Sequence, residues 1–196
     1  VIMAMFAIGL WTRITSVLTA ILVVSYANRA TGAQFGLDQL MGFLCLYLAV
    51  GNSGGAFSVD RWLARRRDRA RDDAGQGRGA GLRGNRAVGG ISTRIAIRLI
   101  QLHMCLVYLF AGLGKLQGET WWNGLAIWYS LASYEYQTID MTWMVETMWL
   151  VNLLTLVTVI WEVGYAGLVW PRLTRPLVLL IAIPVHLGIG LCMGMM

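Results

Sequence analysis

The sequence predicts an all-α protein: a multi-pass transmembrane helical bundle with an aromatic-rich segment at the membrane interface. Of its 196 residues, 57% are hydrophobic and only 13% are charged. The mean hydropathy is +0.61. Soluble domains have a lower apolar share, about 45–50%. Several apolar segments also approach the roughly 20 residues that a helix needs to cross a bilayer. These observations indicate an integral membrane protein.

Six apolar segments are expected to form the spans, the first of them as the tail of a truncated span. They cover residues 1–10, 14–27, 37–50, 95–114, 148–170 and 177–196. Pro184 lies inside the last segment and should kink it, because proline lacks the N–H that a helix interior uses. The first and last segments run to the ends of the sequence. We therefore treat residues 1–196 as a fragment of one membrane domain.

Residues 51–93 form a long polar stretch that we expect to be a basic loop. Eleven of the sixteen cationic residues lie between Arg61 and Arg98. The middle of the stretch, residues 74–90, is rich in glycine and arginine without periodicity, so we expect it to be disordered. The arginines alternate with acids and glycines rather than with stacking aromatic residues. This pattern argues against a nucleic-acid partner.

A second polar stretch, residues 117–145, is rich in tryptophan and tyrosine. Its aromatic residues are Trp121, Trp122, Trp128, Tyr129, Tyr134, Tyr136 and Trp143. Such residues concentrate where a membrane meets water. The sequence therefore predicts that this stretch marks a membrane interface, with a short helix lying along it.

The distribution of cations sets the expected orientation. Loops between spans that are rich in lysine and arginine usually stay in the cytoplasm, so residues 51–93 should be cytoplasmic. Counting spans from there places Arg13, Arg172 and Arg175 on the same side. The same count places Lys115 and the aromatic stretch near the outer side.

Neither the cysteines nor the histidines predict a metal site. Cys45, Cys105 and Cys192 are far apart and have no metal-binding spacing. His103 and His186 fall on different predicted spans, which raises the possibility of a haem. We reject haem because no second ligand pair exists and His103 lies off the polar stripe described next.

Lys115 is the only lysine, against fifteen arginines, and it ends an apolar run from Leu99 to Leu116. A desolvated lysine can lose its proton and act as a base, whereas arginine stays charged. An ionisable residue at membrane depth is a candidate functional residue. The structural alternative is that Lys115 extends its ammonium to the interface from a helix end.

Two predicted spans carry polar faces. On the fourth, Arg94, Gln101, Tyr108 and Lys115 are spaced seven apart and form one slowly turning stripe. A polar stripe on a span should face the bundle interior or a wet cavity. On the fifth, one face carries Asn152, Thr155, Thr158, Glu162 and Tyr165.

Glu162 lies midway along its apolar segment, where an unpaired carboxylate is costly. It must be paired, protonated or exposed to a cavity. His186 follows Pro184, which could open the last span. We therefore expect Gln101, Tyr108, Glu162 and His186 to line a cavity beside Lys115.

Several of these residues resemble one family. The order of elements is Phe-Ser-Val-Asp (57–60), a basic loop, Arg98-x-x-Gln101, Ala111-Gly112-x-x-Lys115-Leu116 and a Trp-rich turn. This order is similar to that of the vitamin K-dependent gamma-glutamyl carboxylases. It looks closest to their bacterial relatives, the horizontally transferred transmembrane (HTTM) domain proteins. The resemblance covers nearly the whole sequence, and the Ala-Gly-x-x-Lys-Leu stretch is its most specific part.

The resemblance implies an activity. Lys115 would be the base that deprotonates reduced vitamin K or menaquinol. Oxygen would then convert the quinol to an epoxide through a strongly basic intermediate. That base would remove a gamma proton from a glutamate, and the resulting carbanion would capture carbon dioxide. The resemblance also implies a glutamate-containing peptide substrate and a bacterial cytoplasmic membrane. One departure is that the residues after Ser-Val-Asp, Arg61 to Arg67, include no histidine. The alternative is a non-catalytic HTTM module that binds quinone or lipid or anchors another domain.

Overall fold

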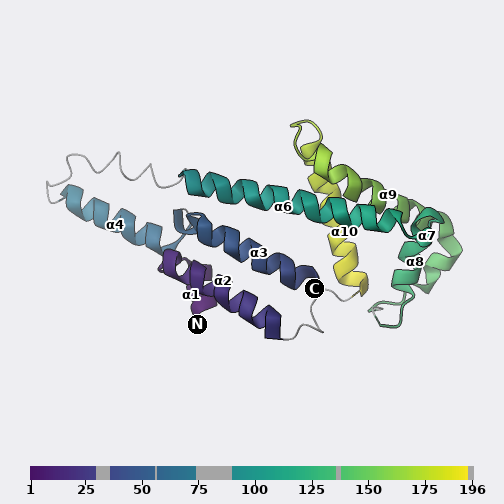
Figure 1. Cartoon of the computed structure of the whole chain (residues 1–196), viewed down its shortest axis with the longest axis horizontal. Helices are drawn as coiled ribbons and strands as arrows, with labels where there is room; N and C mark the ends of the chain where they lie inside the picture. The colour runs from purple at the N-terminus through teal and green to yellow at the C-terminus, as the bar shows by residue number, and fades with distance from the viewer. Residues whose placement is uncertain (30–35, 56, 74–89, 136–137, 194–196) are drawn as a thin grey trace. The chain divides into compact units, whose positions relative to one another are not determined.

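A computed structural model describes residues 1–29, 36–55, 57–73, 90–135 and 138–193 (Figure 1). Every regular element among them is a helix, and these ranges contain no strand. The predicted all-α class is therefore confirmed. The chain divides into two compact units, Val1–Leu102 and His103–Met196. The boundary falls inside α6 (Ile91–Leu116).

Three of the described helices are long and apolar enough to cross a membrane. They are α6, α9 (Met148–Leu168) together with the preceding 3-10 turn η3 (Thr142–Thr147), and α10 (Arg175–Met193). Their positions agree with the predicted spans at 95–114, 148–170 and 177–196. The helical conformation of α10 continues through Pro184. These helices are compatible with an integral membrane protein.

The other three predicted spans correspond to shorter or less apolar helices. α1 (Ile2–Ile8) has seven residues and ends where Gly9 adopts a left-handed conformation, φ 75°. α2 (Thr12–Arg29) has 18 residues, and the apolar α3 (Gly36–Val50) has 15. Six crossings therefore remain a prediction.

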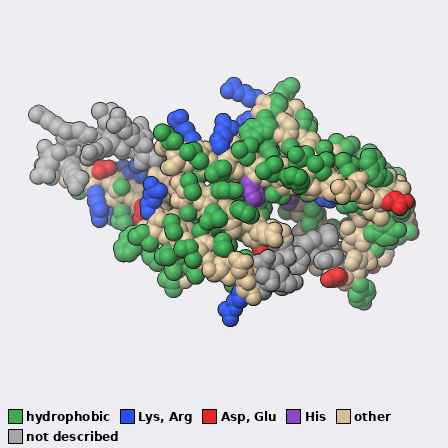
Figure 2. Space-filling model, in the orientation of Figure 1, with side chains coloured by type: hydrophobic (Ala, Val, Ile, Leu, Met, Phe, Trp, Pro, Cys, Tyr) green, Lys and Arg blue, Asp and Glu red, His purple; other side chains and the backbone are tan. Residues whose placement is uncertain are grey.

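The first half of α2 buries its threonines and Ser16 and exposes large aliphatic side chains. The buried residues are Thr12, Thr15, Ser16, Thr19 and Ala20. Ile14 and Ile21, by contrast, are 57% and 56% exposed. Large apolar side chains also cover much of the face shown in Figure 2. Small and hydroxyl residues between helices, with aliphatic residues outward, are typical of packing in lipid.

The prediction that residues 51–93 form a loop is wrong for its first half. A 3-10 turn, η2 (Ser53–Gly55), leads into the 15-residue helix α4 (Val59–Asp73). Ser58 stands directly before α4, and its Oγ accepts the N–H of Arg61 at 3.1 Å. This bond is a helix N-cap, and it offsets one of the unpaired N–H groups of the first turn. The predicted disorder of residues 74–90 falls almost wholly outside the described residues.

Asp60 ties the start of α4 to the start of α2. Its carboxylate accepts the N–H of Trp11 at 2.9 Å, and the N–H and Oγ1–H of Thr12 at 2.8 and 2.7 Å. Burial raises the pKa of Asp60, but these hydrogen bonds outweigh it and the net pKa is lowered. The Phe-Ser-Val-Asp element therefore contains a helix cap at Ser58 and an inter-helix contact at Asp60.

In the second unit, two short helices connect α6 to α9. They are α7 (Glu119–Trp122) and α8 (Ala126–Leu131). Between them Gly124 has φ 74°, and a Cβ there would lie 2.7 Å from the Asn152 Oδ1 of α9. Glycine is needed at this turn because the backbone is left-handed and has no room for a side chain.

The described part of the aromatic stretch 117–145 thus contains short helices, as expected. Several of its rings are exposed: Trp122, Tyr129, Tyr134 and Trp143. Beneath them Leu131, Met144 and Val151 form a buried apolar cluster. This cluster packs α8 and η3 against α9.

Candidate functional site

Gly112 brings α6 close to α9. It is buried, and a Cβ built on it would lie 2.7 Å from Val163 Cγ2, 3.0 Å from Val163 N and 3.2 Å from Glu162 Cβ. Only a residue without a side chain allows this approach, as is common where membrane helices cross. Lys115 follows three residues later, about one helical turn, and so lies over Glu162.

Lys115 and Glu162 form an ion pair. Lys115 Nζ lies 2.5 Å from Glu162 Oε2 and 2.7 Å from Oε1. The Glu162 side chain is 11% exposed and that of Lys115 is 24% exposed. The sequence requires that Glu162 be paired, protonated or exposed to a cavity, and the structure places it in a pair. Nζ also lies 5.2 Å from the ring centroid of Trp121, on α7, within reach of a cation–π contact.

A second polar contact joins α6 to α10. Tyr108 Oη lies 3.0 Å from His186 Nε2, and His186 Nδ1 lies 2.8 Å from the carbonyl oxygen of Ala182. A carbonyl can only accept, so Nδ1 carries a proton. A neutral His186 then leaves Nε2 free to accept the Tyr108 hydroxyl proton. The helix geometry of α10 therefore selects the tautomer that Tyr108 needs.

Aromatic rings surround Tyr108. Its ring centroid lies 4.5 Å from that of Tyr165, 4.9 Å from Trp161 and 6.0 Å from His186. Trp161 and Tyr165 are buried on α9, and the indole N–H of Trp161 donates to the carbonyl of Val178 on α10 at 2.9 Å. Edge-to-face and tilted pairs of this kind stabilise packing beyond the area that they bury. We call Tyr108, Trp161, Tyr165 and His186 the aromatic cluster.

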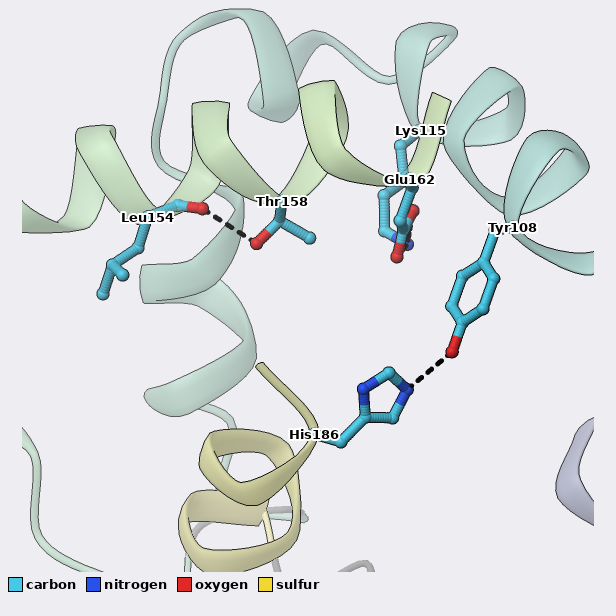
Figure 3. Close-up of polar contacts among 6 residues, drawn as sticks. All are labelled: Tyr108, Lys115, Leu154, Thr158, Glu162 and His186. Atoms are coloured by element: carbon cyan, nitrogen blue, oxygen red, sulfur yellow. Dashed lines mark hydrogen bonds and ion pairs between the residues drawn. The ribbon is translucent and has the colours of Figure 1, made fainter. Parts of the chain in front are cut away.

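The ion pair and the aromatic cluster lie in the same part of the second unit. In Figure 3, Glu162 with Lys115, Tyr108 and His186 extend toward a common space between α6, α9 and α10. All four were predicted to belong to one site. Thr158 points to the same side, but its hydroxyl donates to its own helix, at the carbonyl of Leu154.

Gln101 does not join these residues. It lies in the first unit, is exposed, and its Oε1 accepts a hydrogen bond from the Arg98 guanidinium, one turn earlier, at 3.1 Å. The polar stripe of α6 is therefore divided: its last two members, Tyr108 and Lys115, have polar partners on other helices of the second unit. Gln101 has its partner on its own helix.

The predicted polar face of α9 is largely confirmed. Thr155, Glu162 and Tyr165 are buried, and Thr158 is half-buried. Asn152 is exposed, although it contacts the Gly124 turn. Thr155 is fully buried, with its hydroxyl donating to the carbonyl of Val151 at 2.8 Å. The threonines thus act in packing.

Sequence reasoning missed Trp161. A signal was present, because Trp161 and Tyr165 are four residues apart on one helix face and flank Glu162. It was hidden because a tryptophan in an apolar span is usually a packing residue. Among the described residues no group of three or more His, Cys, Asp or Glu side chains could hold a metal ion.

Comparison with known proteins adds no assignment. No protein-family model, curated protein or solved structure matches the chain.

Proposed function

We propose that this chain is a membrane enzyme of the vitamin K-dependent gamma-carboxylase type. It would couple oxidation of a quinol to carboxylation of glutamate, with Lys115 as the base. The observation that supports this best is the Lys115–Glu162 pair, which lies between apolar helices and beside the aromatic cluster. Ionisable residues in such surroundings are costly to keep and are therefore typical of functional sites.

The pair is suited to accept a proton. Lys115 and Glu162 are two basic groups that share one proton, whichever of them carries it. When Glu162 carries that proton, the Lys115 amine is neutral and its proton site is vacant. A neighbouring hydroxyl could fill it, after which Lys115 is an ammonium and Glu162 a neutral acid. The positive charge would then stabilise an anion beside the pair.

The side chains near the pair fit a quinol. A reduced vitamin K or menaquinol would supply the hydroxyl proton and the redox chemistry, with oxygen and carbon dioxide as co-substrates. Tyr108, which is half-buried, offers an aromatic surface against which a flat ring packs, and the buried Trp161 and Tyr165 hold its ring in place. Lys115 and Glu162 supply the polar groups that would orient its hydroxyls, a combination common in ligand sites. We propose no metal.

The proposed location follows from the charge pattern. The chain would be a multi-pass protein of the bacterial cytoplasmic membrane, with the basic segment 51–93 in the cytoplasm and Lys115 near the outer side. Membrane lipid and the quinol would be its partners, together with a glutamate-containing protein or peptide.

The test is epoxide formation by purified protein in lipid nanodiscs with reduced menaquinone and oxygen. Wild type should form epoxide, and Lys115→Ala should lose about 10²–10⁴-fold, the usual contribution of a general base. Arg172→Ala is the matched control, because it removes an exposed cation in the turn after α9. Equal rates in wild type and Lys115→Ala would exclude Lys115 as the base.

The alternative function is a non-catalytic module that binds quinone or lipid. One observation favours it: both members of the ion pair already have partners, as in a purely structural contact between helices. In that case added menaquinone would quench the tryptophan fluorescence of the wild-type protein, but the protein would form no epoxide. Binding without turnover would therefore replace the enzyme proposal with this one.

A further inference from the structure

α4 has one apolar face bordered by arginines. Val59, Trp62, Leu63 and Arg66 follow the 0, 3, 4, 7 spacing of a single helix face, and Ala70 continues it. Arg66 belongs to this face through its side chain, because its guanidinium carbon lies 3.8 Å from the ring centroid of Trp62. By the 100° step of a helix, Arg65 and Arg69 border the face on one side and Arg67 on the other, and Asp68 lies opposite.

This face is exposed in the described structure. Every residue from 62 to 67 is exposed, with Trp62 at 51% and Leu63 at 39%. The first turn of α4 is held by Ser58 and Asp60, and Figure 1 shows the helix continuing beyond the ends of α1 and α2. An isolated helix of about 12–15 residues is only marginally stable in water. α4 therefore needs a surface that covers Trp62 and Leu63.

We propose that α4 lies in the plane of the membrane surface and binds anionic lipid headgroups. Trp62 and Leu63 would enter the boundary between headgroups and acyl chains. Arg65, Arg67 and Arg69 would extend sideways to the lipid phosphates, and Asp68 would face water. A tryptophan and a leucine flanked by arginines, with an acid on the far side, is the pattern of an interfacial amphipathic helix.

Charge and connectivity identify lipid as the partner. From Val59 to Ala70 there are five arginines and two aspartates, a net charge of +3, and Asp60 is engaged with α2. The cytoplasmic leaflet carries a negative surface potential that attracts such segments. α4 also stands in the chain between the apolar α3 and the candidate span α6. The start of α4 follows the end of the apolar α3 after a short connection, which holds this end of α4 near that helix.

The experiment uses the full chain with one environment-sensitive NBD label. Cys45, Cys105 and Cys192 are replaced by alanine, and the label is attached through Leu63→Cys or, on the opposite face, Asp68→Cys. Each protein is reconstituted in phosphatidylcholine vesicles with or without phosphatidylglycerol. The readouts are the emission wavelength and quenching by aqueous iodide or by lipid-borne doxyl groups.

At position 63 we expect a blue shift, loss of iodide quenching and gain of doxyl quenching when phosphatidylglycerol is present. The label at position 68 should remain accessible to iodide. Arg65→Gln/Arg69→Gln or high salt should reverse the change at 63, because headgroup attraction is electrostatic. Arg29→Gln/Arg172→Gln removes the same charge elsewhere and should not reverse it.

Two results would overturn the proposal. In the first, the label at 63 is accessible to iodide in every vesicle. In the second, it is protected equally with and without phosphatidylglycerol and after loss of Arg65 and Arg69. The second result would mean that α4 packs against protein rather than against anionic lipid.

Discussion

At the scale of single residues, the central feature is that Lys115 and Glu162 depend on each other. Each charge lies where few water molecules can reach it, so each is stabilised chiefly by the other. A mutation of either one therefore has two effects, a change in chemistry and the cost of an unpaired charge. Comparing single with double variants separates these two effects.

Lys115→Met and Glu162→Met should each destabilise the protein by about 3–5 kcal/mol, the usual cost of leaving one charge of a buried pair without its partner. Lys115→Met/Glu162→Met should recover most of that loss, because no charge remains. Unfolding in detergent, followed by circular dichroism, measures both. Additive losses in the two single variants and the double variant would show that the charges do not interact.

The His186 tautomer can be measured directly. In a His103→Gln background, ¹⁵N spectra should show that Nδ1 of His186 carries a proton, because Nδ1 faces the Ala182 carbonyl. Tyr108→Phe should shift the Nε2 resonance, since Nε2 loses its hydrogen-bond donor, and leave the tautomer unchanged. A proton on Nε2 in the wild type would contradict the proposed direction of the Tyr108–His186 bond.

The sequence identifies most of these residues but not their pairing. Lys115 and Glu162 stand out because ionisable groups are rare in apolar spans, and helix spacing gives the face on which each lies. Spacing on one helix carries no information about which partner helix meets that face, so the contact between Lys115 and Glu162 required a structure. Gln101 shares the spacing of Tyr108 and Lys115, but Arg98 on the same helix provides its partner.

At the scale of elements, the crossing of α6 and α9 depends on Gly112. Gly112→Ala should destabilise the second unit by about 1–3 kcal/mol, the typical cost of overpacking. The clash includes the backbone nitrogen of Val163, which cannot rotate away. Thermal unfolding of the variant in detergent measures the loss.

Gly114→Ala is the matched control. A Cβ at Gly114 would have no other atom within 4 Å, so this change should be neutral or stabilising by up to about 1 kcal/mol. Equal effects of the two substitutions would mean that α6 and α9 do not cross closely at Gly112.

The contact that Asp60 makes between α4 and α2 should make the free energy of unfolding depend on pH. Its folded-state pKa lies below the unfolded value of about 3.9, so its stabilisation is present above about pH 4 and is lost as the pH falls through the folded pKa. Asp60→Asn should therefore cost about 1 kcal/mol at pH 7 and progressively less in acid. The measurement is the free energy of unfolding of both proteins between pH 7 and pH 3.

Asp68→Asn is the control for this effect, because it removes one negative charge from the same helix. A constant difference between wild type and Asp60→Asn across the pH range would show that the hydrogen bonds from Trp11 and Thr12 do not stabilise the charged carboxylate.

α4 illustrates what composition hides. Its run of arginines and aspartates suggests a solvated loop, and the expectation of a loop across residues 51–93 rested on that average. The local signals for a helix were the Ser58 cap and the spacing of Val59, Trp62 and Leu63. They involve only four residues, so a composition average over the whole stretch obscures them.

At the scale of the whole molecule, the apolar composition predicts the helical class and the positions of the long helices. It does not predict where a helix ends. α1 stops at Ile8 because Gly9 adopts a left-handed conformation, so a single residue inside an apolar run ends the helix. The sequence therefore predicts the positions of the long helices better than the ends of the short ones.

The proposed orientation predicts which residues a reagent can reach from each side of the membrane. In a Cys192→Ser background, Tyr134→Cys should react with a membrane-impermeant maleimide from outside intact cells, and Arg172→Cys should react only after lysis. Both positions are exposed, so accessibility depends on sidedness rather than burial. The reverse pattern would place the arginines of segment 51–93 outside and would contradict the charge rule.

The central claim is that Lys115 works by taking a proton, and Lys115→Arg tests it most directly. Arginine keeps the positive charge and can keep the ion pair with Glu162, but it does not give up its proton. We predict that Lys115→Arg unfolds at nearly the wild-type temperature and forms no epoxide from reduced menaquinone. Wild-type epoxide formation by a folded Lys115→Arg protein would contradict the claim, because a fixed positive charge rather than a neutral amine at position 115 would then be sufficient.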